Sequence, residues 1–348
     1  MATFYRKGSL MSRRVVVVGP IEDASLSGPG SVVKVLLSGF DELGIGYDFV
    51  NTYNISLCKT IRLFLKLIFH KNYIINVHTF GYKIPYLVMI ASKINKNNEY
   101  YLTMHGVNSY EYAINGMAKE SEKIKKIEKR LVKDFPNIIC VSKFLQDYVE
   151  KKYSRHKNVF YVNNCVGSTN KKMPKKDNGY IFLYTGGFSN RKNPRGAIEF
   201  FSNCCYKKKN GAKMIMCGSR DNVELYNECM HLISRGSLKN AVMVLGKLDK
   251  NTLEKYYKEA NFIIAPSVFD TFNMSVLEAM SFGCIPIVSN NCGIQDIINN
   301  ENGYIIERMK EGQSVFMNMK DLSENAFKTA IRFDAGKMAE GYKRIMKI

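Results

Sequence analysis

The chain has 348 residues, of which 46% are hydrophobic and 24% are charged. This composition is that of a globular protein with room for two domains, and no apolar stretch is long enough to span a bilayer. The 9 cysteines form no C-x-x-C pair, which argues against a zinc site or a disulfide framework and favours a reducing cytoplasm. The formal net charge of +20 indicates an anionic partner, such as nucleic acid, an anionic membrane surface or a phosphorylated substrate.

The first half of the sequence alternates short apolar runs with segments of helical length. The run 15–18 is followed by a glycine loop at 28–30, and then by a helical pattern. Further strand candidates are 47–50, 73–77, 100–104 and 138–141. This alternation predicts an α/β fold with a doubly wound parallel sheet, and residues 1–166 are expected to form a first Rossmann-like domain.

The second half repeats the alternation after a polar, basic stretch at 167–179, which we interpret as the interdomain linker. Its strand candidates are 180–184, 213–217, 242–245, 262–265 and 285–288. They predict a second Rossmann-like domain over 180–328, and residues 329–348 are expected to return to the first domain as a helix. Ligands of such sheets bind at the carboxyl ends of the strands, so the loops after the strands should carry the chemistry.

A basic segment lies in the predicted first domain. Residues 49–98 contain seven Lys or Arg and no acid. Within it, one face of a predicted helix is basic and the opposite face is apolar; the basic face has Lys59, Arg62, Lys66 and His70, and the apolar face has Ile61, Phe64, Leu65 and Ile68. Such a helix can lie on an anionic membrane, although a helix packed on its sheet with a solvated basic face has the same pattern. Together with the net charge, the segment favours peripheral contact with an anionic membrane and a membrane-borne acceptor.

The strongest functional signal lies in residues 265–293, which read APSVFDTFNMSVLEAMSFGCIPIVSNNCG. Seven residues separate Asp270 from Glu278. Asp270 is expected in the loop after a strand and Glu278 about two turns into the next helix, so the two carboxylates can reach different ends of one extended ligand. The N-terminus of that helix offers free N–H groups and a positive dipole end to a diphosphate. Taken alone, Asp270 could equally be a helix cap.

This segment resembles the donor-binding signature of glycosyltransferase family 4, which has two acidic residues separated by seven others. The resemblance implies the GT-B fold, with two Rossmann-like domains whose parallel sheets face a central cleft. It also implies that Glu278 holds the ribose hydroxyls of the nucleotide and that Asp270 faces the transferred sugar. Asp270 departs from the family pattern, which usually has Glu at this position. The remaining predicted donor-binding residues of this segment are Phe272, Asn273, Met274 and Ser275.

A second segment, 182–194, resembles the family's glycine and basic-residue loop, in which an Arg and a Lys neutralise the departing diphosphate. Lys192 matches the position of the Lys. Gly187 stands at the usual position of the Arg, so Arg191 is a displaced substitute for it. Positioned cations can stabilise a leaving group without a metal.

Three further positions resemble the family more weakly. His105, at the end of a predicted strand, resembles the histidine that contacts the transferred sugar, although a single histidine after a strand is more often structural. Gly28 and Gly30 resemble the N-terminal glycine loop, and Gly218 resembles the loop beside the nucleotide base. Glycine loops are common in α/β proteins for purely structural reasons.

Through this resemblance, the sequence is expected to encode a retaining glycosyltransferase of the hexosyltransferase type (EC 2.4). It would transfer a sugar from a nucleotide sugar, by resemblance a UDP-sugar, to a hydroxyl of a saccharide or lipid-linked acceptor in polysaccharide, lipopolysaccharide or glycolipid assembly. No metal or cofactor is expected beside this co-substrate, and the expected location is the cytoplasm at the inner face of the cytoplasmic membrane. Two alternatives remain: a degenerate GT-B protein without activity, because Asp270 and Gly187 depart from the pattern, and a basic nucleic-acid-binding α/β protein. Nucleic acid is not an expected partner, because the sequence shows no motif with aromatic residues interleaved on one basic face.

Overall fold

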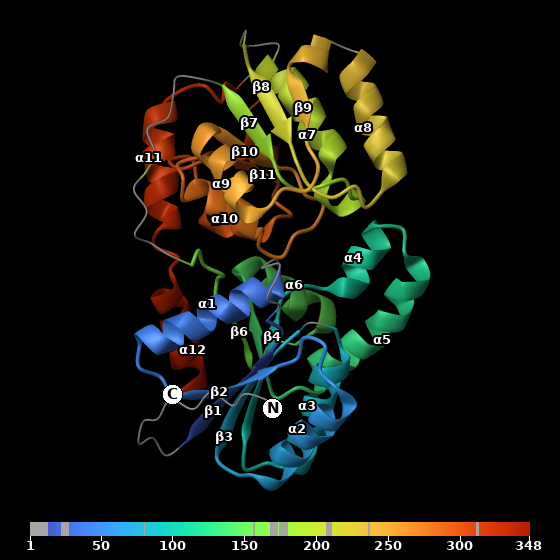
Figure 1. Cartoon of the computed structure of the whole chain (residues 1–348), viewed down its shortest axis with the longest axis vertical. Coiled ribbons are helices and arrows are strands. Elements are labelled where there is room, and N and C mark those ends of the chain that lie inside the picture. Colours follow the sequence, from blue (N-terminus) through green and yellow to red (C-terminus); the bar gives the residue numbers. More distant parts are fainter. Residues whose placement is uncertain are drawn as a thin grey trace. The chain divides into compact units, whose positions relative to one another are not determined.

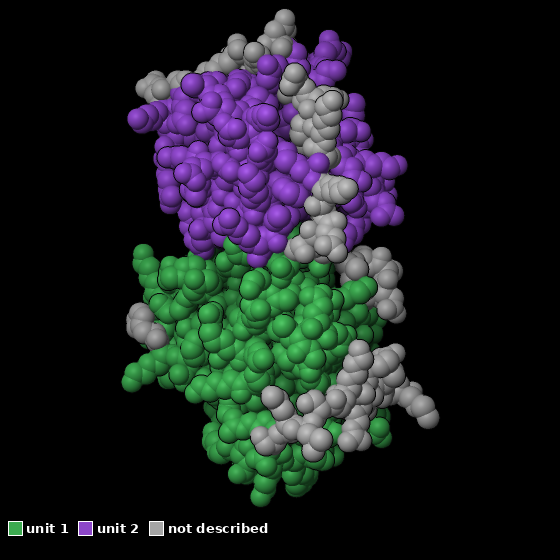
Figure 2. Space-filling view, turned by 90° about the vertical axis from the view of Figure 1, so that its left-hand side faces the viewer, with its two compact units in different colours: residues 1–167, 333–348 green, residues 168–332 purple. Residues whose placement is uncertain are grey.

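The computed structural model describes residues 13–21, 28–79, 81–155, 157–167, 173, 180–206, 211–235, 237–310 and 313–348. The chain divides into two compact units, residues 1–167 with 333–348 and residues 168–332 (Figure 2). Each unit contains a six-stranded parallel sheet, as expected for two Rossmann-like units. Apart from residues 167 and 173, the predicted linker lies outside the described residues.

The sheet of the N-terminal unit has the order β2-β1-β3-β4-β5-β6 (Figure 1). Its strands are β1 (Arg14–Gly19), β2 (Tyr47–Asn51), β3 (Tyr73–His78), β4 (Glu99–Met104), β5 (Asn137–Cys140) and β6 (Val159–Tyr161). The first five coincide with the predicted strands to within one residue at each end. Parallel strands are covered on both faces, so they have continuous apolar sequences, and β3 is buried at every position.

The strand order reverses between β1 and β3, and crossover connections in parallel sheets are right-handed. The connection from β1 to β2 therefore covers one face of the sheet, and the connections from β2 to β3 and from β3 to β4 cover the other. The helices are α1 (Pro29–Glu42), α2 (Leu57–Phe69), α3 (Lys83–Ile94), α4 (Asn108–Ile114), α5 (Ala118–Asp134), α6 (Lys143–Tyr153) and, from the end of the chain, α12 (Ala335–Met346).

The last helix, α12, packs against α1. Gly39 allows this close approach, because a Cβ at this position would lie 2.1 Å from the carbonyl oxygen of Ala335. Tyr342 and Met338 of α12 are buried in the same apolar cluster as Leu36 of α1. The end of the chain therefore completes the core of the N-terminal unit.

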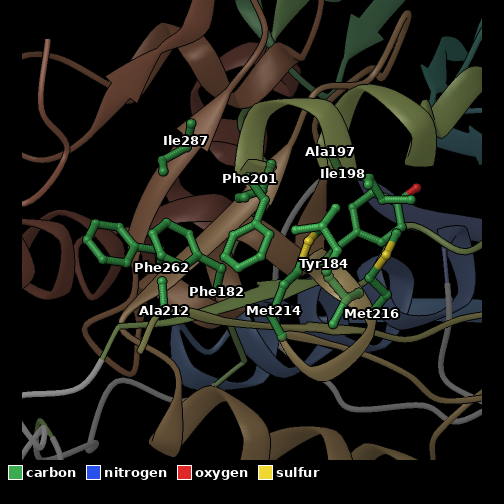
Figure 3. Packing of buried hydrophobic residues seen from close by; sticks show 14 of the residues in the cluster. Phe182, Tyr184, Ala197, Ile198, Phe201, Ala212, Met214, Met216, Phe262 and Ile287 are labelled. Carbon is green, nitrogen blue, oxygen red and sulfur yellow. The ribbon is translucent and has the colours of Figure 1, made fainter. Parts of the chain in front are cut away.

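The sheet of the C-terminal unit has the order β12-β11-β10-β7-β8-β9. Its strands are β7 (Ile181–Tyr184), β8 (Lys213–Met216), β9 (Val242–Val244), β10 (Phe262–Ala265), β11 (Ile285–Val288) and β12 (Tyr304–Ile305). In the core, the rings of Phe182 and Phe262 stack with centroids 4.4 Å apart, and Phe201 meets Phe182 edge to face (Figure 3). These contacts join the central strands β7 and β10 to the helical layer.

The helices of the C-terminal unit are α7 (Pro194–Phe200), which continues into a π-helical turn (Phe201–Tyr206), α8 (Val223–Arg235), α9 (Lys250–Glu259), α10 (Met274–Met280) and α11 (Met319–Ala330). Short 3-10 turns follow β7 (η1, Asn190–Lys192), α8 (η3, Ser237–Asn240), β11 (η4, Gly293–Ile297) and β12 (η5, Ile306–Arg308). None of the helices in the described ranges combines the length and the apolar character that a membrane crossing requires.

Candidate functional site

The strand order of the C-terminal unit reverses between β7 and β10. Ligands of open α/β sheets bind at such switch points, outside the carboxyl ends of the strands. Arg191 and Lys192 follow β7 in the turn η1, and Asp270 follows β10. Because β7 and β10 are neighbours, the sheet brings together Lys192 and Asp270, which are 78 residues apart in the sequence.

Asp270 is the central residue of this cluster and is only 6% exposed. Its Oδ2 lies 2.5 Å from Nζ of Lys192 and 3.6 Å from Nη1 of Arg191, and its Oδ1 accepts a 3.2 Å hydrogen bond from the N–H of Phe272. Burial raises the pKa of Asp270, but the two cations and the hydrogen bonds outweigh burial, so the pKa lies below its ordinary value. Asp270 is therefore ionised near neutral pH, and the two cations leave the cluster with a net positive charge.

Three hydrogen bonds hold the basic turn against the loop that follows β10. The guanidinium of Arg191 donates to the carbonyl oxygen of Phe269 at 3.2 Å, and the carbonyl oxygen of Arg191 accepts from the N–H of Val268 at 2.9 Å. Asn193 has a left-handed backbone with φ of 52°, and its side chain donates to the carbonyl oxygen of Pro266 at 3.1 Å. The positions of both cations are thus fixed by the fold.

Gly187 and Gly218 meet backbone to backbone at the ends of β7 and β8. Their φ values are +67° and +136°, and a Cβ at Gly218 would lie 2.4 Å from Cα of Gly187. A Cβ at Gly187 would in turn lie 3.0 Å from backbone atoms of Ser219. This crowding and the positive φ explain why a glycine, and not an arginine, occupies position 187.

Glu278 lies in the second turn of α10, half-buried. Its Oε2 accepts a 3.4 Å hydrogen bond from the hydroxyl of Tyr257 in α9. Burial and the nearby carboxylate of Glu278 raise the pKa of Tyr257 well above its ordinary value, so this hydroxyl keeps its proton and remains a donor. Tyr257 was not predicted from the sequence, because an aromatic residue in an amphipathic helix usually indicates core packing only.

Four of the predicted donor-binding residues lie around the start of α10. Phe272 is buried, Asn273 has a left-handed backbone with φ of 71°, and Met274 and Ser275 begin the helix half-buried. Within the described residues, the side chain of the N-cap residue Asn273 makes no capping hydrogen bond to α10.

In the N-terminal unit, His105 follows β4 and pairs with His78, the last residue of β3. Nε2 of His105 lies 2.9 Å from Nδ1 of His78, and the N–H of His105 donates to the hydroxyl of Thr79 at 3.0 Å. Burial lowers the pKa of His105 to about 3, and burial together with His105 lowers the pKa of His78 well below its ordinary value. Both rings are therefore neutral near pH 7.

His78 was not predicted from the sequence. The signal that could have identified it is the apolar run of β3, which ends in a histidine, just as a histidine directly follows the run of β4. Its Nε2 is buried and has no hydrogen-bond partner among the described residues. The other predicted residues of this unit, Gly28 and Gly30, lie at the start of α1, where Gly28 has a φ of +64°.

The described residues contain no group of three or more His, Cys, Asp or Glu side chains arranged to hold a metal ion.

Residues 168–330 match the family of glycosyl transferases group 1. The matched segment includes Lys192, Asp270 and Glu278. A 128-residue alignment is 28% identical to an uncharacterized glycosyltransferase of Methanocaldococcus jannaschii and covers 36% of this chain and 31% of that protein. Another, over 125 residues, is 27% identical to the O-antigen chain mannosyltransferase B of Escherichia coli and covers 35% of this chain and 31% of that protein. The chain thus matches about a third of the length of these curated relatives.

The structure is also similar to the crystal structure of Anabaena HepE in complex with UDP and glucose. The TM-score is 0.67 at 14% sequence identity, and the likeness covers 97% of this chain and all of the other. It shows that the fold is GT-B, as predicted from the sequence.

Proposed function

We propose that the protein is a glycosyltransferase that transfers a sugar from a nucleotide sugar to a hydroxyl of an acceptor. One observation carries this proposal: Arg191, Lys192 and Asp270 form a cationic cluster at the switch point of the unit that matches glycosyl transferases group 1. The hexosyltransferase class and retention of the anomeric configuration are also proposed, on the resemblance to glycosyltransferase family 4.

In this proposal the cationic cluster binds the diphosphate of the donor. Asp270 holds both Lys192 and Arg191 by ion pairs. The two basic side chains are still about one-fifth exposed, so a ligand can reach them. Cations fixed in advance stabilise the negative charge that develops on a departing diphosphate without a cost of reorganisation. We propose UDP as the nucleotide, because the similar HepE structure contains UDP.

Glu278 is proposed to accept hydrogen bonds from the ribose hydroxyls, with its carboxylate oriented by Tyr257. Asp270 is proposed to face the transferred sugar while it orients Lys192. The amides of residues 272–275 and the glycine backbone at Gly187 and Gly218 are proposed to lie along the phosphates and the base. Gly28 and Gly30 are proposed to line the donor or acceptor in the N-terminal unit.

The proposed reaction needs no covalent bond between protein and sugar. The acceptor oxygen bonds to the anomeric carbon while the bond from that carbon to the phosphate oxygen breaks, and the nucleoside diphosphate leaves with the electron pair. The hydroxyl proton passes to the leaving phosphate oxygen. His105, neutral near pH 7, is proposed to hydrogen-bond the transferred sugar. The proposal includes no metal or cofactor.

The acceptor is proposed to be a saccharide or a lipid-linked saccharide in polysaccharide, lipopolysaccharide or glycolipid assembly. An O-antigen chain mannosyltransferase among the relatives supports this class. A lipid-linked acceptor would place the protein in the cytoplasm, at the inner face of the cytoplasmic membrane.

Release of nucleoside diphosphate from UDP-, GDP- and ADP-sugars, with a panel of saccharide acceptors, tests the proposed function. We expect release from one donor class, and a rate at least about 100-fold lower in Lys192→Met, because one electrostatic stabiliser of the transition state is lost. Lys320→Met, which removes an exposed lysine of α11, serves as the control and should match the wild type. Absence of release with every donor would favour the degenerate protein, and salt-sensitive RNA binding without release would favour the nucleic-acid alternative.

A further inference from the structure

An apolar stripe on α2 is exposed in the N-terminal unit. Its residues are spaced four apart, so they follow one side of the helix. They are Leu57, Ile61, Leu65 and Phe69, with exposed fractions of 74%, 50%, 45% and 74%. Single exposed apolar residues are ordinary, but a continuous apolar surface of this kind marks a site of interaction. We call these four residues the α2 stripe.

The position of the α2 stripe differs from the sequence prediction. Ile61 and Leu65 were predicted on the apolar face opposite the basic residues, which in a packed helix would lie against the sheet. In the structure, Leu63 and Leu67 are the buried residues of α2. On an α-helix these two residues lie on roughly the opposite side from the stripe, so the stripe faces away from the packed side of α2.

Helix α3 lies beside α2 (Figure 1). The side chains of Asn95 and Asn98, just after α3, donate to the carbonyl oxygen of His70, just after α2, at 2.6 and 2.9 Å. The two helices therefore end at the same edge. There α3 exposes Ile94 by 58% and Ile90 by 38%.

Cations lie along one flank of the α2 stripe. Lys59 and Arg62 are exposed, and neither forms an ion pair within the part of the chain that the structure describes. His70 and Lys71, which follow the helix, are also exposed. The helix thus presents an apolar strip and a basic strip side by side.

A groove of about 530 Å³ opens where these two strips meet β1 and β2. It is lined by Arg14, Asp48, Arg62, Lys66 and His70, together with two residues of the stripe. Asp48 lies 3.2 Å from Nζ of Lys66 and 3.8 Å from Nε of Arg14. Apart from His70, three cations and one carboxylate give the groove a net charge of +2.

We propose that this face of α2 and α3 docks onto an anionic lipid bilayer. The α2 stripe enters the boundary between headgroups and acyl chains, Lys59 and Arg62 contact lipid phosphates, and the groove receives the phosphate of one headgroup. An apolar strip beside a basic strip matches the layered chemistry of an anionic bilayer, whereas a nucleic acid would match only the cations. This inference rests on the proposed function in one respect, that the acceptor lies in the membrane. The docking surface itself follows from the exposed residues of α2 and α3 and from the groove.

Sedimentation of the 348-residue protein with vesicles tests the apolar part of this inference. The wild type should bind phosphatidylglycerol vesicles and not phosphatidylcholine vesicles. Leu57→Ser/Phe69→Ser, which changes the two most exposed side chains of the stripe, should weaken binding by at least about tenfold, because these groups no longer leave water. Val223→Ser/Met317→Ser changes two similarly exposed apolar residues of the C-terminal unit and should bind as the wild type does.

A second pair of variants tests the cations. Lys59→Gln/Arg62→Gln should weaken binding by about 30-fold at low salt, since each surface cation near an anionic bilayer is worth roughly fivefold. Lys123→Gln/Lys126→Gln removes the same charge from the exposed face of α5 and should have a much smaller effect. In the wild type, modification of the exposed Cys58 thiol by a maleimide, followed by mass spectrometry of its peptide, should slow when phosphatidylglycerol vesicles are added.

The inference is overturned if the wild type does not bind phosphatidylglycerol vesicles, if the α2 variants bind as their controls do, or if Cys58 reacts at an unchanged rate. Binding of single-stranded RNA through Lys59 and Arg62 in place of vesicle binding would also overturn it. Thermal unfolding of each variant shows whether the fold is intact. Vesicle binding without nucleotide binding would refute the proposed function alone, and nucleotide binding without vesicle binding would refute this inference alone.

Discussion

At the scale of single residues, Asp270 joins Lys192 and Arg191 in one cationic cluster. Lys192 and Asp270 belong to two motifs that the sequence shows separately. Their contact follows from the strand order, in which β10 pairs with β7 and not with β9, and no local pattern determines that order. The contact of Arg191 with Asp270 could not be predicted for a similar reason, because it depends on the path of the turn η1.

The pair of His78 and His105 predicts how stability depends on pH. In the unfolded chain a histidine gains a proton below about pH 6.5, whereas folded His105 stays neutral down to about pH 3. The unfolded state therefore binds more protons in this window, and stability is full above about pH 6.5 and falls as the pH is lowered. The slope should reach up to about 1.4 kcal/mol per pH unit for each such histidine.

Urea unfolding at pH 7, 6 and 5 measures this slope. His105→Gln should reduce it, and His231→Gln, which changes an exposed histidine of α8, should leave it unchanged. Asp270 has a lowered pKa, so its protonation reduces stability only below about pH 4, the ordinary pKa of an aspartate. It therefore does not contribute to the slope between pH 7 and 5. An equal slope in His105→Gln and the wild type would contradict the assignment of a neutral histidine pair.

At the scale of elements, the sequence predicted the strands well, because buried parallel strands have continuous apolar sequences. It missed β6 and β12, which have three and two residues and are too short for a periodic pattern. The amphipathic pattern of α2 was also visible, but periodicity does not determine which part of a broad apolar arc faces the sheet. Only the packing of Leu63 and Leu67 decides that the α2 stripe is exposed.

The glycine contact between the loops after β7 and β8 gives a prediction at this scale. Gly218→Ala should lower the free energy of unfolding by at least about 2 kcal/mol, because its φ of +136° is unfavourable for alanine and its Cβ would overlap Gly187. Gly246→Ala, in the loop after β9, is the matched control, since a Cβ there meets no atom within 4 Å. Urea unfolding of both variants checks the prediction, and equal stabilities would contradict it.

At the scale of the whole molecule, the two ends of the chain are joined in one unit. Residues 333–348 belong with residues 1–167, and Tyr342 of α12 is buried, with its hydroxyl 3.3 Å from that of Thr103 in β4. The stability of the N-terminal unit therefore depends on a helix that follows the C-terminal unit in the sequence. The core of the N-terminal unit is therefore built from two parts of the sequence that the C-terminal unit separates.

Tyr342→Ala should destabilise the N-terminal unit by about 3–5 kcal/mol, the usual cost of removing a buried aromatic ring. Hydrogen exchange should then accelerate in β3 and β4, while exchange in residues 180–332 stays unchanged. Lys343→Ala, at the exposed neighbouring position, is the control. Faster exchange in both units would show that they do not unfold independently.

The most direct test of the central claim, that the switch point of the C-terminal unit binds a nucleoside diphosphate, is calorimetric titration of the 348-residue protein with UDP, GDP and ADP. We predict that one nucleotide, expected to be UDP, binds the wild type. It should bind equally well to the control Glu254→Gln in α9. Its affinity should fall by at least about tenfold in Glu278→Gln, since one hydrogen-bonded charge is lost. Equal affinity in Glu278→Gln and the control, or no binding of any of the three nucleotides to the wild type, would contradict the account.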